Sequence, residues 1–128
     1  MRALVVDDSR SMRLILRRIL TQIGFEVLEA EDGQVALDML ARMDEPPELA
    51  TVDWNMPNMN GLEFVTAVRK EARLRDMALM MVTTESEHNQ IVRALAAGAH
   101  EYVIKPFTAV AIADKLALLG LVPNGATL

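Results

Sequence analysis

The residues best suited to chemistry in this sequence share one position, directly after a short apolar run. They are Asp7, Asp8, Asp53, Thr83, Thr84 and Lys105. Carboxylates that come close together repel one another, by roughly 4 kcal/mol per pair at about 4 Å and an effective dielectric constant of about 20. A cation relieves this repulsion, and hard oxygen ligands without His or Cys beside them favour Mg²⁺.

A carboxylate, a magnesium ion and a lysine are the groups that phosphoryl transfer requires. Asp53 can act as the nucleophile and form an acyl phosphate. The metal ion and Lys105 would neutralise the phosphoryl oxygens, and the Thr83 hydroxyl would bond to one of them. These residue types therefore indicate phosphorylation of an aspartate.

Each of these residues also has an ordinary structural interpretation when it is taken alone. Asp8 or Ser9 fits the N-cap of a first helix. Asp53 fits a turn before the Asn- and Pro-containing segment that follows it, and Lys105 fits a plain strand end. The convergence of polar groups from four different strands on one sheet edge is much harder to explain by chance.

Five apolar segments have the length and composition of buried strands. They are residues 3–6, 25–30, 49–52, 77–83 and 101–104. The segments between them have helical spacing of apolar residues. The predicted helices are one over 12–23, one starting at Val35, one over 61–72, one ending at Gly98 and one ending at Gly120. We expect Thr84 or Ser86 to cap the fourth helix.

Strands that alternate with helices in this way predict an α/β fold. The expected architecture is a doubly wound, five-stranded parallel sheet with five helices, distributed over both faces and joined by right-handed crossovers. In such sheets, ligands bind beyond the carboxyl ends of the strands. All the candidate residues lie at that edge, so the fold predicts that they meet in one site.

The length of 128 residues fits one domain. We expect it to cover residues 1–120 and to be followed by a short C-terminal tail, 121–128. The absence of cysteine excludes disulfides and thiolate metal sites, and a cytoplasmic location is expected. No signal peptide is visible, and no apolar stretch approaches the roughly 20 residues that cross a bilayer, so membrane insertion is not expected.

The net charge of −5 argues against nucleic acid as a partner. One basic cluster interrupts the acidic balance, and it is read as a solvated helix face. It consists of Arg10, Arg13, Arg17 and Arg18. The expected partners are therefore proteins.

Five motifs together resemble the receiver domain of bacterial response regulators, and within that family the single-domain chemotaxis regulators of the CheY type. The motifs are "VVDDS", "DWNMPNMNGLEF", "MVTTE", "AAGA" and "YVIKPF", in family order and at family spacing. The resemblance covers about residues 2–119, almost the whole chain. It implies the flavodoxin-like strand order 2-1-3-4-5.

The resemblance also implies a role for each matching residue. Asp53 matches the phosphoacceptor, which also binds Mg²⁺ directly together with Asp8 and the Asn55 backbone carbonyl. Asp7 matches the acid that holds a metal-bound water, and Lys105 the lysine that pairs with the phosphoryl group through a cis Lys–Pro segment.

The remaining matches concern switching and the lifetime of the phosphorylated state. Thr83 matches the switch hydroxyl, and Tyr102 the aromatic residue that turns inward when the threonine moves. Asn55, Thr84 and Glu85 match positions that tune dephosphorylation, and quick self-dephosphorylation is expected.

The implied function is a signalling switch without classical enzymatic turnover. A histidine kinase or a phosphotransfer protein would phosphorylate Asp53, and a downstream protein would read the face formed by the fourth helix, fifth strand and fifth helix. Chemotaxis control is the expected output, and a phosphorelay intermediate is the alternative. Two functions of other classes are disfavoured. A Mg²⁺-dependent phosphatase with an aspartyl-phosphate intermediate needs an Asp-x-Asp motif on the first strand, and a flavin-binding module needs a phosphate-binding loop after it, whereas this sequence has Asp7-Asp8 there.

Four positions depart from the pattern of the resembled family. Thr84 stands where a smaller residue is usual, and its extra bulk is expected to crowd access to Asp53. Asn60 replaces an acid at a helix start and is expected to be harmless there. Glu87 and His88 replace two lysines, which reverses the charge on the expected output face.

Overall fold

Five strands form one parallel sheet in the order β2-β1-β3-β4-β5 in the computed structural model, which describes residues 1–123. The strands are β1 (Arg2–Val6), β2 (Glu26–Ala30), β3 (Leu49–Val52), β4 (Ala78–Thr83) and β5 (Glu101–Ile104). Val6 pairs with Ala30 on one side and Val52 on the other, so the central strands end at the same level. The predicted fold class and strand order are confirmed.

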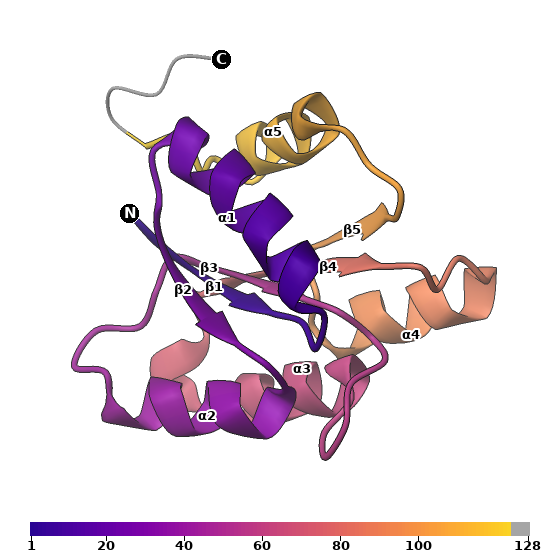
Figure 1. Ribbon diagram of the computed structural model, residues 1–128. Helices are drawn as coiled ribbons and strands as arrows, with labels where there is room; N and C mark the ends of the chain where they lie inside the picture. Colours follow the sequence, from indigo (N-terminus) through magenta and orange to yellow (C-terminus); the bar gives the residue numbers. More distant parts are fainter. Residues whose placement is uncertain (124–128) are drawn as a thin grey trace.

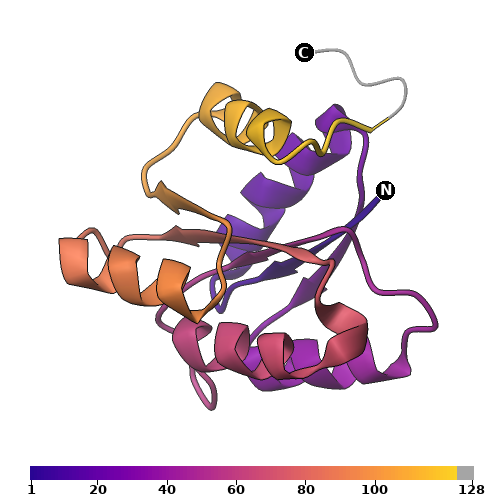
Figure 2. The same ribbon diagram turned by 180° about the vertical axis from the view of Figure 1, so that it is seen from behind.

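The helices cover both faces of this sheet, as Figures 1 and 2 show. They are α1 (Arg10–Ile23), α2 (Gly33–Arg42), α3 (Gly61–Lys70), α4 (His88–Ala97) and α5 (Ala109–Leu118). The helices α1 and α5 pack on one face, and α2, α3 and α4 pack on the other, which gives two hydrophobic cores. The three central strands are apolar because both of their faces are buried.

Local signals set several of these helix ends. The Ser9 side chain accepts a hydrogen bond from the Met12 amide and caps α1, which ends at Gly24 with a left-handed φ of 118°. Asn60 forms a reciprocal capping box with Glu63 at the start of α3, so an asparagine serves well at that position.

Several predicted boundaries differ from the structure by one or two residues. Strand 3–6 begins one residue earlier, at Arg2, and the helices predicted from Met12 and Val35 begin at Arg10 and Gly33. The helix predicted over 61–72 ends at Lys70, and a short 3₁₀ turn, η1 (Ala72–Leu74), follows it. Strands 25–30 and 77–83 each begin one residue later, because Phe25 and Met77 pack into the cores outside the sheet.

The predicted cap of the fourth helix is wrong. The N-cap of α4 is Glu87, and its side chain makes no capping hydrogen bond. Thr84 and Ser86 are both exposed in the preceding segment, where neither starts the helix. The sequence offers several capping residues in succession there, so composition alone does not select one.

Part of the predicted tail 121–128 lies against the domain. The Leu121 amide donates a hydrogen bond of 2.9 Å to the Leu116 carbonyl, and its side chain packs on the core beneath α1 and α5. Residues 124–128 lie outside the described part of the chain. Within residues 1–123, no helix has the length and apolar character needed to cross a membrane.

Candidate functional site

Three strand ends carry acidic and basic residues to one edge of the sheet. The Asp53 amide donates to the Val6 carbonyl at 3.0 Å, which continues the pairing of β3 with β1. The Lys105 amide donates to the Thr83 carbonyl at 2.9 Å, which continues the pairing of β5 with β4. The backbone of each residue is therefore fixed by the sheet itself, and the predicted convergence of the strand ends is observed.

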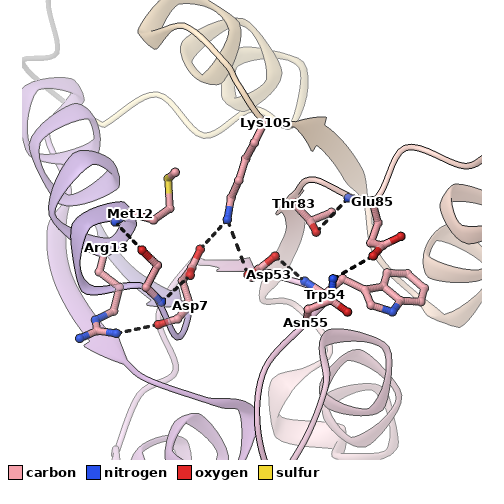
Figure 3. Close-up of polar contacts among 10 residues, drawn as sticks. Asp7, Met12, Arg13, Asp53, Trp54, Asn55, Thr83, Glu85 and Lys105 are labelled. Atoms are coloured by element: carbon pink, nitrogen blue, oxygen red, sulfur yellow. Dashed lines mark hydrogen bonds and ion pairs between the residues drawn. The ribbon is translucent and has the colours of Figure 1, made fainter.

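Lys105 lies between two of the carboxylates, as Figure 3 shows. Its Nζ atom is 3.0 Å from Oδ2 of Asp7 and 3.6 Å from Oδ2 of Asp53. All three side chains are largely buried, so solvent screens these charges weakly. The Lys105–Pro106 peptide bond is cis, as the resemblance implied.

Asp7, Asp8 and Asp53 form the acidic cluster that the sequence predicted. One oxygen from each of them lies within 4.8 Å of the others. Asp7 and Asp53 are buried, whereas Asp8 is exposed. One lysine faces three carboxylates, so the cluster keeps an excess of negative charge.

The electrostatics of Asp53 reflect this excess. Burial raises the pKa of its carboxyl above the ordinary value, the Asp7 carboxylate raises it further, and Lys105 opposes both effects. A divalent cation would remove the repulsion, and the donor set consists of hard oxygens. The residues present therefore fit Mg²⁺, and Asp7, Asp8 and Asp53 each offer it a carboxylate oxygen.

Backbone amides orient both buried acids. Oδ1 of Asp7 accepts from the Ser9 amide at 2.9 Å, and the Arg13 guanidinium donates to the Asp7 carbonyl at 2.7 Å. Oδ1 of Asp53 accepts from the Trp54 amide at 2.8 Å, which leaves Oδ2 toward Lys105. The Trp54 side chain is buried in the core beside the site.

A second group of polar residues lies beside the acidic cluster. The buried Thr83 hydroxyl accepts from the Glu85 amide at 3.3 Å, and the Tyr102 hydroxyl donates to the Glu85 carbonyl at 2.7 Å. The Asn55 side-chain amide donates to the Glu85 carboxylate at 2.8 Å. Thr84 is exposed beside them. Thr83, Asn55 and Tyr102 are thus joined through one residue, Glu85.

Tyr102 is half-buried at the end of this chain of hydrogen bonds. Burial, together with the nearby Glu85 and Asp53 charges, raises the pKa of its phenol to about 12. The hydroxyl therefore stays protonated at neutral pH and acts as the donor to the Glu85 carbonyl.

Sequence reasoning missed several residues that shape the site. A Cβ atom at Gly61 would lie 2.3 Å from the Asp53 carbonyl oxygen, so only glycine permits this close approach. Arg13 was placed on a solvated face, yet it bonds to the Asp7 backbone. Asp32 is buried and bonds to Asn58 in the loop after β3. The pair "DG" at 32–33 is a helix-start signal, but it does not reveal that loop contact.

Comparison with known proteins gives a consistent result. The family model of the response regulator receiver domain matches residues 3–117. A chemotaxis protein CheY homolog of Campylobacter jejuni is 48% identical over 117 residues, which cover 91% of this chain and 89% of the relative. Chemotaxis protein CheY1 of Helicobacter pylori is 44% identical, with 91% and 94% of the two chains covered.

Solved structures give the same picture of the backbone. Chemotaxis protein CheY4 of Vibrio cholerae superposes with a TM-score of 0.84 at 33% sequence identity. That match covers 91% of this chain and 96% of the other.

Proposed function

The chain belongs to the response regulator receiver family, and we propose on that premise that it is a phosphoryl-accepting switch of a two-component system with Asp53 as the acceptor. The observation that carries this proposal is the position of Lys105, whose ammonium lies 3.0 Å from Asp7 and 3.6 Å from Asp53. It can pair with a phosphoryl group on Asp53 while Asp7 keeps it in place. A lone acid at a turn would need no such arrangement.

The transfer step uses the oxygen of Asp53 that no backbone amide holds. Oδ2 attacks the phosphorus of a phosphohistidine, the phosphorus–nitrogen bond breaks, and the histidine keeps the electron pair. Lys105 stabilises the charge on the transferred group. Mg²⁺, when bound, supplies further charge neutralisation. We assign its direct ligands to Asp8, Asp53 and the Asn55 carbonyl, with Asp7 acting through a water.

The signal would leave the site through the residues joined at Glu85. A phosphoryl group on Asp53 would draw the Thr83 hydroxyl toward it, and this would break the bond of 3.3 Å from the Glu85 amide. The Glu85 carbonyl holds the Tyr102 hydroxyl at 2.7 Å, so Tyr102 follows any change in that segment. The result is a population shift between two packings of the segment.

The proposed output surface is the face formed by α4, β5 and α5, and its reader is a protein. Exposed apolar side chains on two of these elements support this assignment. They are Val92 at 48%, Leu95 at 43% and Ile104 at 41% exposure. The named relatives favour chemotaxis control over a phosphorelay role. Glu87 and His88 give this face a different charge from the two lysines expected of a motor-binding regulator.

Water attack on the acyl phosphate would reset the switch. Asn55 and Glu85 bond to each other at the mouth of the site, 2.8 Å apart, and Thr84 is exposed next to them. These residues control the path of a water molecule to Asp53. We expect quick self-dephosphorylation, and a phosphorylated state that survives for hours would contradict this.

The first experiment is phosphorylation by a small phosphodonor with and without Mg²⁺, followed by intact mass and Trp54 fluorescence. We expect labelling that requires Mg²⁺ and disappears in Asp53→Asn, while Lys105→Met is labelled much more slowly. Labelling that persists in Asp53→Asn would refute the assignment of the acceptor. If the small donor fails, transfer from a phosphohistidine protein distinguishes blocked access from an inactive site.

A phosphomonoester substrate tests the phosphatase alternative. A switch accepts a phosphoryl group from a phosphohistidine and releases it slowly to water, so we expect no sustained hydrolysis of the ester. Continuous Mg²⁺-dependent turnover that Asp53→Asn abolishes would instead identify a phosphatase.

A further inference from the structure

The loop between β3 and α3 is fastened to a different part of the molecule, the start of α2. The Asn58 side-chain amide donates to Oδ2 of Asp32 at 3.0 Å. Oδ1 of the same carboxylate accepts from the Val35 amide at 2.9 Å and caps α2. Asp32 is only 4% exposed, so one buried carboxylate connects the loop to the helix.

The backbone of the loop is unusual at the point of attachment. Asn58 has a φ of 67°, and it is the only residue other than glycine with positive φ in the described chain. Asparagine tolerates this left-handed conformation better than most residues. The bond to Asp32 therefore selects a conformation that the chain would otherwise populate weakly.

A packing contact reinforces this hydrogen bond. Met59 lies so close to Gly33, the first residue of α2, that a Cβ atom there would be 2.9 Å from the Met59 Cγ atom. Asn58 and Met59 together hold the tip of the loop against α2. The Gly61 amide closes the loop at its other end through a bond of 2.8 Å to the Trp54 carbonyl.

The charge state of Asp32 favours a strong attachment. The Val35 amide and, after it, the Asn58 side chain lower the pKa of Asp32 below its ordinary value. The carboxylate is ionised at neutral pH, and hydrogen bonds to an ionised acceptor are stronger than those between neutral groups. Asp53 has the opposite environment, since burial and Asp7 raise its pKa.

We propose that Asp32 and Asn58 are positioning residues for the cation site. Their hydrogen bond fixes the loop that carries Asn55, the residue whose backbone carbonyl we assign to the metal, before any cation binds. This inference rests on the proposed function, because it concerns the affinity of that same site. A preformed loop spares the cation the cost of ordering the ligand, which gives tighter binding.

The chain permits a swap of the two side chains as a test. Asn58→Asp keeps the size of the side chain and tolerates positive φ, but it places one carboxylate against another. Adding Asp32→Asn reverses the polarity of the pair, because the asparagine then donates to the new aspartate. The double variant keeps the wild-type net charge, and asparagine still caps α2. Gln34→Glu, at an exposed position near Asp32, controls for the added negative charge.

The measurement is the dissociation constant for Mg²⁺ alone, from Trp54 fluorescence, together with the free energy of unfolding without Mg²⁺. We expect Asn58→Asp to raise the dissociation constant by roughly tenfold, as for other residues that support metal ligands. The double variant should return to the wild-type value, and Gln34→Glu should not bind Mg²⁺ more weakly than the wild type. The swap thus separates the hydrogen bond from charge and size.

Each other outcome overturns the inference in a recognisable way. If Asn58→Asp binds Mg²⁺ as tightly as the wild type, or if it only unfolds more easily, the pair has a purely structural role. A double variant that is stably folded but still binds weakly excludes the hydrogen bond as the cause. If the wild type itself shows no Mg²⁺ response that Asp53→Asn alters, the proposed function fails first.

Discussion

The two edges of the sheet use charge in opposite ways. At the carboxyl edge, three carboxylates and Lys105 face one another, and the pKa of Asp53 is raised. At the amino edge, guanidinium groups face backbone carbonyls instead. The side chain of Arg69 donates to four of them, those of Leu74, Arg75, Met77 and Gly98.

This difference distinguishes charged side chains that stabilise the fold from charged side chains that are suited to binding a ligand. Arg69 joins α3, η1, the start of β4 and the end of α4, so its bonds lock several elements together. Asp53 receives one backbone amide and the Thr83 side chain, and it also faces the charges of Asp7 and Lys105. A charge that is surrounded by hydrogen-bond partners stabilises the native state, whereas a charge beside like charges is partly unfavourable until a counter-ion binds.

The largest expected effect is the loss of the Arg69 guanidinium. Arg69→Met keeps most of the aliphatic stem but leaves four carbonyls without this donor. We expect the free energy of unfolding to fall by about 3 kcal/mol, since hydrogen bonds to charged groups are strong and partly buried carbonyls lose their partner. Urea unfolding followed by circular dichroism measures this.

Arg73 provides the matched control at the same edge. Its guanidinium donates to only two carbonyls, those of Leu40 and Met43. Arg73→Met should therefore cost clearly less than Arg69→Met. If the two variants lose the same stability, or if Arg69→Met loses less than about 1 kcal/mol, the amino edge is not held by these bonds.

Removing a charge at the carboxyl edge should have the opposite sign. Asp53→Asn keeps an acceptor for the Trp54 amide and removes the repulsion with Asp7. In a chelator, at neutral pH, we expect the variant to be more stable than the wild type by about 1 kcal/mol. Urea unfolding of both proteins measures the difference. A variant less stable than the wild type would contradict the claim that the charge of Asp53 is unfavourable without a cation.

Mg²⁺ should reverse this order of stability. A cation at one hundred times its dissociation constant stabilises a native protein by about 2.7 kcal/mol. Asp53→Asn removes one of the proposed ligands, so it should gain much less from the same concentration. If Mg²⁺ does not raise the free energy of unfolding of the wild type, the acidic cluster does not bind this cation.

The pH dependence of the same pair gives a smaller effect with a definite sign. The pKa of Asp53 is higher in the folded protein than in the unfolded chain, so ionisation costs stability at neutral pH. As the pH falls from 7 toward about 4, the folded carboxyl takes up its proton first and the cost disappears. The stability gap between Asp53→Asn and the wild type should therefore close. A gap that widens on acidification would show that the shift has the opposite sign.

The sequence was sufficient to predict the carboxyl edge because a parallel sheet converts sequence position into spatial position. Each strand ends at the same edge, so Asp7, Asp53 and Lys105 had to converge once the alternation of strands and helices was recognised. The order of the strands in the sheet, by contrast, was predicted only from the family resemblance. Periodicity locates strands and helices, but it does not order the strands within the sheet.

The amino edge and the loop attachment could not be predicted in this way. The bonds of Arg69 reach carbonyls up to 29 residues away, and the Asp32–Asn58 bond spans 26 residues. A side chain that bonds to backbone groups leaves no periodic pattern, and arginine on a helix usually means a solvated face. The prediction of the α4 cap was wrong for a related reason, because the segment before the helix contains several residues that could cap it.

The smallest expected effect concerns His100, which connects to the amino edge. Its Nδ1 atom accepts from the Leu79 amide at 3.0 Å and lies 3.2 Å from the Arg69 guanidinium. Burial lowers the pKa of this imidazole, and the Arg69 charge lowers it further. The neutral ring is thus the form that fits, since protonation at Nδ1 would remove the acceptor from the Leu79 amide.

The sign of the pH effect follows from that lowered pKa. The unfolded chain binds the proton more tightly, so the contribution of His100 is complete above about pH 6.5 and is lost as the pH falls toward the folded pKa. His100→Gln cannot titrate, so the wild type should lose stability relative to it between about pH 7.5 and 5.5. The change should be small, because the imidazole is only partly desolvated: His100 as a whole residue is exposed, so solvent screens its charge.

His88, an exposed histidine at the start of α4, supplies the control for this comparison. His88→Gln removes an imidazole that does not contact Arg69. The free energy of unfolding of this variant in urea should depend on pH as that of the wild type does. Combining His100→Gln with Arg69→Met should give less than the sum of the two losses, because they share one hydrogen-bond network. Strict additivity would mean that His100 lies beside the network without taking part in it, and the amino edge would then depend on Arg69 alone.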